Sequence, residues 1–288
     1  MQGFVELLPV VLKLCVSALI FAIGLGSTLG DLTYLWRRPG LLLRSLLAMY
    51  VLVPLAAFLL AQVLPLAPAV KAGMLVLAVS AGAPLLPRKM SKFGGGSYAF
   101  SLVVISSVLA VFLVPAWVAL LAPHFAVEAE VSPWAVAAVI GKAFLLPLLI
   151  GMVLRMIVGQ AGERYSDRLM VLAGGVMTLV AIALLVAHWE MLFKIVQRPG
   201  MLALLALMGG ALAIGHWLGG PTADDRTALA VACATRHVGV AVLVASAFPG
   251  ARTVAMIAAY ALASVLVSIP YLRWRRKRSA SDVVESVT

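Results

Sequence analysis

Apolar residues in this chain form long continuous runs, the pattern of helices buried in a membrane rather than of half-exposed helices in a soluble domain. A helix needs about 20 apolar residues to cross the hydrocarbon core. Three prolines (Pro39, Pro133 and Pro199) stand near the starts of runs, where the missing N–H of proline costs no hydrogen bond. Seven runs are long enough and predict transmembrane helices near 8–29, 40–64, 97–122, 133–158, 164–188, 198–219 and 250–271.

Two further apolar segments, 69–93 and 224–247, contain residues that interrupt a membrane helix. Proline, glycine and fixed positive charge occur in them, at Gly82, Pro84, Pro87 and Arg88 in the first and at Arg236, His237 and Gly239 in the second. A charge at the centre of a membrane helix costs roughly 2.5–3.5 kcal/mol on insertion scales, so it marks a functional site by default. We therefore predict two broken helices, interrupted at Gly82, Pro84, Pro87 and Gly239, and nine crossings in all.

The distribution of Lys and Arg predicts the orientation of the chain. With nine crossings and an outside N-terminus, most basic residues lie inside: Arg37, Arg38, Arg44, Arg88, Lys89, Lys92, Arg155, Arg164, Arg168, Arg226, Arg273, Arg275, Arg276, Lys277 and Arg278. Those outside are Lys71, Lys194, Arg198 and Arg252. Cytoplasmic loops carry the excess of positive charge, so we expect an N-out, C-in protein of the bacterial inner membrane.

The composition agrees with this class of protein. Of the 288 residues, 64% are hydrophobic and only 11% are charged, which excludes a soluble domain. In a soluble protein the net charge of +11 would suggest a nucleic-acid partner. Here the basic loops that fix the orientation account for it, and we expect no nucleic acid as a partner.

Few side chains could carry out covalent chemistry. Cys15 and Cys233 lie in apolar segments without a CxxC spacing, so neither a disulfide nor a metal site is indicated. Thr222 followed by Asp224–Asp225 predicts a helix N-cap rather than a catalytic pair of carboxylates. No acidic residue in the predicted spans could partner His237 as an acid–base pair. The sequence therefore argues against an enzyme and predicts no metal or organic cofactor.

Two short motifs recur in the same order and predict an internal repeat. Arg38-Pro39-Gly40 recurs as Arg198-Pro199-Gly200, and Leu77-Ala78-Val79 recurs as Leu229-Ala230-Val231. The two RPG motifs are five spans apart, so they face opposite sides of the membrane. An inverted repeat of this kind is typical of secondary transporters. We predict a first repeat of four spans over 1–125, a second of five spans over 133–272, and a basic cytoplasmic tail over 273–288.

Broken helices have a specific use in such a protein. The interruption frees backbone N–H and C=O groups that lipid cannot satisfy. Half-helix N-termini favour anions, whereas the freed carbonyls favour cations. Two breaks related by an inverted repeat would meet near the midplane and form one site. Rocking of one group of helices against the other would then expose this site to each side in turn.

The sequence resembles the bile acid:sodium symporter family. The resemblance rests on the run Gly24–Leu29, the Arg38-Pro39 loop and the two broken segments, and covers roughly residues 15 to 272. It implies an all-α polytopic protein with two inverted repeats, a panel domain, and a core domain with two crossing broken helices; this chain resembles the nine-span form that lacks the first helix. It also implies symport of an organic anion, such as a bile acid, a sulfated steroid or a small carboxylate, with two sodium ions.

Most positions that hold sodium in the family carry other residue types here. The equivalent positions are Met49, Pro87, Arg88, Ser101, Ile105, Ala232, Arg236 and His237, of which Ser101 retains the family's residue. The family has a carboxylate at the position of Ala232 and amide side chains at Arg236 and His237. Sodium prefers hard oxygen ligands. We therefore expect weak sodium coupling or none.

We expect Arg88, Arg236 and His237 to act as fixed cations that replace sodium and attract the anionic substrate. His237 could also couple transport to protons, because its ordinary pKa lies near physiological pH. A simpler interpretation of Arg88 is a cytoplasmic surface charge. A simpler interpretation of Arg236 and His237 is structural pairing of the two half-helices.

Other functions stay open at this point. One alternative is a conventional sodium:organic anion symporter. Others, from a different class, are a membrane channel or sensor and a membrane-embedded enzyme. The sequence leaves the substrate, the coupling ion, the direction of transport and the oligomeric state undetermined.

Overall fold

The computed structural model describes residues 2–66, 68–80, 82–83, 85–91, 93, 95–121, 132–187, 199–236, 240–241, 259–260, 263–264 and 266–278. Within these ranges the regular structure is helical, apart from one isolated β-bridge. Among the described residues, four helices are long and apolar enough to cross a membrane: Pro39–Val63, Gly96–Leu120, Pro133–Val158 and Gly200–Leu218. Leu14–Gly26 and Val70–Val79 are shorter apolar helices. The chain is therefore an all-α, multi-pass membrane protein, as predicted.

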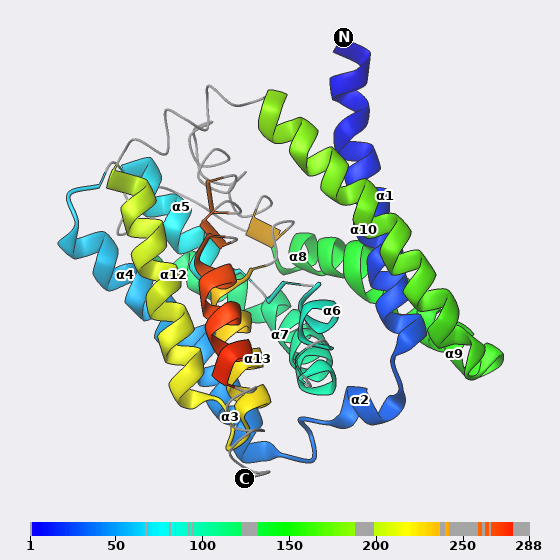
Figure 1. Cartoon of the computed structure of the whole chain (residues 1–288). Coiled ribbons are helices and arrows are strands. Elements are labelled where there is room, and N and C mark those ends of the chain that lie inside the picture. The colour runs from blue at the N-terminus through cyan, green and yellow to red at the C-terminus, as the bar shows by residue number, and fades with distance from the viewer. Residues whose placement is uncertain are drawn as a thin grey trace.

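The elements follow one another closely along the chain, and Figure 1 shows their arrangement. They are α1 (Gln2–Gly26), α2 (Leu29–Thr33), α3 (Pro39–Leu47), η1 (Ala48–Leu52), α4 (Val53–Val63), α5 (Pro68–Val79), α6 (Leu86–Ser91), α7 (Gly96–Leu121), α8 (Pro133–Ile140), η3 (Gly141–Leu145), α9 (Leu146–Val158), α10 (Ala161–Ala187), α12 (Pro199–Leu218) and α13 (Ala223–Ala234). Residues 266–278 form a final helix.

Helices α1, α9 and α10 pack together on one side of the molecule (Figure 1). Two glycines bring α1 and α9 into backbone contact. A Cβ atom on Gly24 would lie 2.2 Å from the carbonyl oxygen of Leu148, and one on Gly151 would lie 2.3 Å from that of Phe21. Ser166 on α10 donates to the carbonyl of Ala22 at 2.6 Å. Small residues permit this close approach where no water drives helices together. We call α1, α9 and α10 the panel group.

A second group contains α3–η1–α4, α5, α12, α13 and the final helix, on the opposite side of Figure 1. Glycine again sets the closest approach, because a Cβ atom on Gly215 of α12 would lie 2.5 Å from Cα of Ala230 on α13. Almost the whole of α13 from Thr227 onward is buried. We call these elements, with α6 and α7, the core group.

Proline reshapes the helix that runs from α3 through η1 to α4. Pro54 has no N–H, so it cannot donate to a carbonyl in the preceding turn. The helix widens to a π-turn in which the Val53 N–H donates to the carbonyl of Ala48, five residues back. The carbonyls of Met49 and Tyr50 thereby lose their ordinary backbone donors. Trp117 Nε1 donates to the Tyr50 carbonyl at 2.9 Å, which satisfies one of the two.

Helix α13 begins as the sequence predicted. Thr222 Oγ1 accepts from the Asp225 N–H at 3.1 Å, which confirms the N-cap. Asp225 also has a long-range role: its buried carboxylate accepts from Tyr34 Oη at 3.3 Å and lies 3.8 Å from Nη1 of Arg38. These contacts fix the connection between α2 and α3 against the start of α13.

The final helix extends beyond the end expected at residue 271, into the basic residues up to 278. Arg275 explains the extension, because it is buried against α13. Its Nε donates to Thr227 Oγ1 at 2.9 Å, and its Nη2 donates to the Ala223 carbonyl at 3.0 Å. Tyr271 on the same helix hydrogen-bonds to His216 Nδ1 at 2.8 Å. The first six residues of the basic segment 273–288 are therefore a docked helix.

Candidate functional site

The two interrupted segments meet. Helix α5 ends at Val79, and extended chain follows α13, where Thr235 has φ −115° and ψ 133°. Gly82 and Arg236 pair as an isolated antiparallel β-bridge. Backbone groups that no helix can satisfy therefore find partners in each other. Ser80, Gly82 and Ala83 of the first segment and Thr235 and Arg236 of the second form the centre of the candidate site, and we call this centre the crossing.

Side chains from the core group pack tightly around Gly82. A Cβ atom at Gly82 would lie 3.1 Å from Cε of Met49 and 3.3 Å from Oγ of Ser106. Pro87, which the sequence predicted as an interruption, is buried in the first turn of α6 and so lies inside a helix. Three predicted site residues, namely Pro84, His237 and Gly239, lie outside the described residues.

Arg236 is the buried charge at the crossing, with only 4% of its surface exposed. Its Nη1 donates to the carbonyl of Ser80 at 3.2 Å, and Nη1 and Nη2 both reach the carbonyl of Met49 at 3.4 Å. Ser80 directly follows the last turn of α5, and the Met49 carbonyl is the other of the two that the π-turn before Pro54 leaves without a backbone donor. The guanidinium thus occupies the place where freed carbonyls would otherwise hold a cation.

Among the described residues, Arg236 is surrounded by dipoles and has no carboxylate partner. Ion pairs in this part of the chain join Arg38 to Asp225 and Arg155 to Glu163. Near the crossing, Tyr260 Oη donates to the Ala234 carbonyl at 3.0 Å. A buried charge is expensive unless hydrogen bonds stabilise it, and carbonyl oxygens fill this role for Arg236. The arrangement resembles a cation site more than a salt bridge.

Among the other sodium-position equivalents that the structure describes, Met49 reaches Arg236 and Ser101 is engaged elsewhere. Ser101 Oγ accepts from the Leu35 N–H at 3.2 Å and donates to the Leu32 carbonyl at 2.9 Å, so it secures the connection that follows α2. Ile105 and Ala232 are buried and contribute no polar side-chain ligand. Met49 contributes through its backbone carbonyl, which the sequence alone did not reveal. Pro54, five residues after Met49, was the signal in the sequence that this carbonyl could lack a backbone donor.

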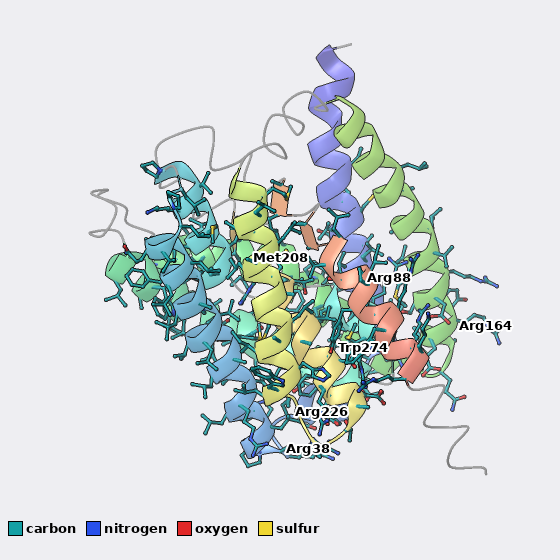
Figure 2. The ribbon with its side chains drawn as sticks, turned by 60° about the vertical axis from the view of Figure 1, so that its left-hand side comes forward. Arg38, Arg88, Arg164, Met208, Arg226 and Trp274 are labelled. Atoms are coloured by element: carbon teal, nitrogen blue, oxygen red, sulfur yellow. The ribbon has the colours of Figure 1, made fainter. Side chains whose placement is uncertain are left out.

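Arg88 lies in a different environment from Arg236. It is half-buried on α6, and Figure 2 shows it labelled above Trp274. Its guanidinium packs against α10, because a Cβ atom on Gly174 would lie 2.5 Å from both Nη1 and Nη2. The structure therefore places Arg88 where the core group meets the panel group, and Arg236 inside the core group.

The helical architecture and the crossing can be compared with known proteins. The family model of the sodium bile acid symporter family matches residues 13–198. The chain belongs to this family. No curated protein matches the sequence. The matched region contains Gly82 and Arg88 but ends before α12 and α13, which carry the other half of the crossing. Family membership makes the chain a membrane transporter of the sodium/bile-acid symporter type, consistent with the expectation that it is not an enzyme.

Proposed function

We propose that the protein is a secondary transporter of a small organic anion, and that Arg236 replaces a coupling sodium ion. The observation that carries the proposal is the donation from Arg236 to the carbonyls of Met49 and Ser80. A sodium ion bound there would leave in every cycle, whereas a guanidinium stays. Sodium would therefore contribute little to the transport cycle.

Two features support alternating access over nine crossings. Helix α1 begins at the top of Figure 1 and the final helix ends at the bottom, as an odd number of crossings requires. Helices α3 and α12, which start at the two RPG motifs, begin at opposite ends of the molecule in the same view. This is the relation that an inverted repeat demands. The panel group would then rock against the core group around the crossing, in an N-out, C-in protein.

The anion would bind where the two groups face each other. Arg88 lies at this boundary, against α10. A guanidinium can donate two parallel hydrogen bonds to a carboxylate or a sulfate. His237 follows Arg236 directly in the sequence and is our candidate for proton coupling. A pH profile of uptake that is unchanged in His237→Gln would refute the role of His237.

The test measures uptake of organic anions into proteoliposomes under defined ion gradients. A thermal-shift screen of the purified protein with taurocholate, a sulfated steroid and short carboxylates selects the probe. We expect uptake of the selected anion to be equal in sodium and in choline buffers. Uptake that requires an inward sodium gradient would refute the replacement of sodium by Arg236 and would support the conventional symporter.

The same experiment separates the other classes of function. Binding of the anion without uptake would support a sensor. Uptake without counterflow would support a channel; counterflow is the transient accumulation of labelled anion that is driven by an opposing gradient of unlabelled anion. Arg44→Gln is a suitable control variant, because Arg44 is exposed on α3 and is neither part of the crossing nor one of the predicted site residues.

A further inference from the structure

A cleft with a volume of about 470 Å³ lies between α6 and the final helix. Four basic side chains line it: Arg88 and Lys89 come from α6, and Arg273 and Arg276 come from the final helix. None of the lining residues that the structure describes is acidic. Four like charges around one cleft repel one another unless an anion lies between them.

The rest of the cleft wall is apolar. Leu85, Ile269 and Leu272 line it together with Phe93, whose ring centroid lies 4.9 Å from the guanidinium carbon of Arg276. The cleft thus offers charge to one part of a ligand and hydrocarbon to another. A fully hydrated small anion would leave this apolar wall unused.

The basic residues of the final helix are held in place. Arg275, between Arg273 and Arg276, is only 8% exposed and donates to α13. Trp274 packs against His216, with ring centroids 5.7 Å apart. Figure 2 shows Trp274 in the same half of the molecule as Arg38, Arg164 and Arg226. Tryptophan beside a basic cluster is typical of the membrane interface, where lipid headgroups lie.

We propose that this cleft binds an anionic phospholipid, whose phosphate contacts Lys89, Arg273 and Arg276 and whose first acyl carbons contact Leu85 and Ile269. The amphipathic wall favours a lipid over a free phosphate, and the uniformly basic charge of the described lining residues favours an anionic over a zwitterionic headgroup. The proposal does not depend on the identity of the transported anion. It concerns a site that stabilises α6, the second half of the first broken helix, against the final helix.

The experiment measures the thermal stability of the detergent-solubilised full chain with short-chain lipids. Dioctanoyl phosphatidylglycerol, dioctanoyl phosphatidylcholine and inorganic phosphate are titrated into the wild type and into Arg273→Gln/Arg276→Gln. The matched control, Arg37→Gln/Arg44→Gln, removes two exposed arginines outside the cleft. We expect phosphatidylglycerol to stabilise the wild type and the control equally, and to bind the cleft variant about thirtyfold more weakly, the effect of two basic residues near an anionic surface.

Three outcomes would overturn the proposal. Equal weakening in the control variant would show general attraction to positive charge rather than a site. Equal stabilisation by phosphatidylcholine would remove the role of the headgroup charge. Stabilisation by inorganic phosphate that matches the phosphatidylglycerol effect, and is lost in the cleft variant, would assign the cleft to a free anion. A cleft variant that unfolds during purification is replaced by Arg273→Lys/Arg276→Lys, for which we expect stabilisation to be retained.

Discussion

Removal of the Arg236 side chain tests the central claim about the crossing, because Arg236→Ala leaves the carbonyls of Met49 and Ser80 without their donor. Hydrogen bonds to a charged group contribute about 1.5–3 kcal/mol each. The distances of 3.2–3.4 Å are long, so the lower value applies to each carbonyl. We therefore expect a loss of about 3 kcal/mol in the free energy of unfolding.

The measurement is thermal unfolding in detergent, with Arg226→Ala as the control. Arg226 is on the same helix and also donates to a backbone carbonyl, that of Gly220 at 3.1 Å, but it is exposed. Water can replace an exposed donor, so the control should lose less than about 1 kcal/mol. At roughly 2–4 °C per kcal/mol for chains of this size class, the two variants should differ by about 4 °C or more.

Sodium provides the second part of the test. In Arg236→Ala the freed carbonyls form a site that a small cation can enter. We expect sodium chloride to stabilise Arg236→Ala more than the wild type, and more than choline chloride at the same concentration does. If Arg236→Ala unfolds at the temperature of Arg226→Ala, the guanidinium does not hold the crossing. If sodium stabilises all three proteins equally, the guanidinium does not replace a cation.

Three further predictions concern other parts of the structure. Gly151→Leu should prevent assembly of the panel group, because even a Cβ atom there would lie 2.3 Å from the Phe21 carbonyl oxygen. We expect the variant to lose the monodisperse peak in size-exclusion chromatography, whereas the control Gly209→Leu, where the space is open, should keep it. Gly82→Val should lower the unfolding temperature by displacing Met49, and a melting curve equal to that of the wild type would contradict the packing at the crossing. Burial would raise the pKa of Asp31, but hydrogen bonds from the hydroxyl of Ser97 and from Thr28 outweigh it and lower the pKa below the ordinary 3.8. The ionised carboxylate therefore adds stability above about pH 4, and this stability disappears as the pH falls through the lowered pKa. Its contribution is less than about 1 kcal/mol, because the site is partly exposed. Between pH 6 and pH 3, Asp31→Asn should lose less stability than the wild type.

Helix boundaries followed closely from the sequence wherever apolar runs and prolines coincide. The spans expected over 40–64, 97–122 and 133–158 correspond to Pro39–Val63, Gly96–Leu120 and Pro133–Val158. The N-cap at Thr222 was equally readable, since a side-chain oxygen three residues before an N–H acts locally. The end of the final helix could not be predicted in this way, because Arg275 extends the helix through contacts with α13, about 50 residues earlier in the chain.

The candidate site divides in the same way. The sequence identified Arg88 and Arg236 as anomalous charges in apolar segments, and grouped them as one cationic site. Their separation into a charge inside the core group and a charge against α10 became visible only in three dimensions. Side-chain type and spacing carry no information on which backbone carbonyls lie within reach of a long, flexible arginine.

The sequence by itself determined the membrane class, the bounds of the helices at which apolar runs and prolines coincide, and two segments that interrupt a helix, because hydrophobicity, proline and charge act on neighbouring residues. The tertiary structure decided what satisfies those breaks. Pro54 frees the carbonyl of Met49 within one helix, and the carbonyl of Ser80 ends another, but only packing brings both to the guanidinium of Arg236. Hydrogen bonds between segments more than 150 residues apart depend on how helices pack, and no local pattern in the chain encodes that distance.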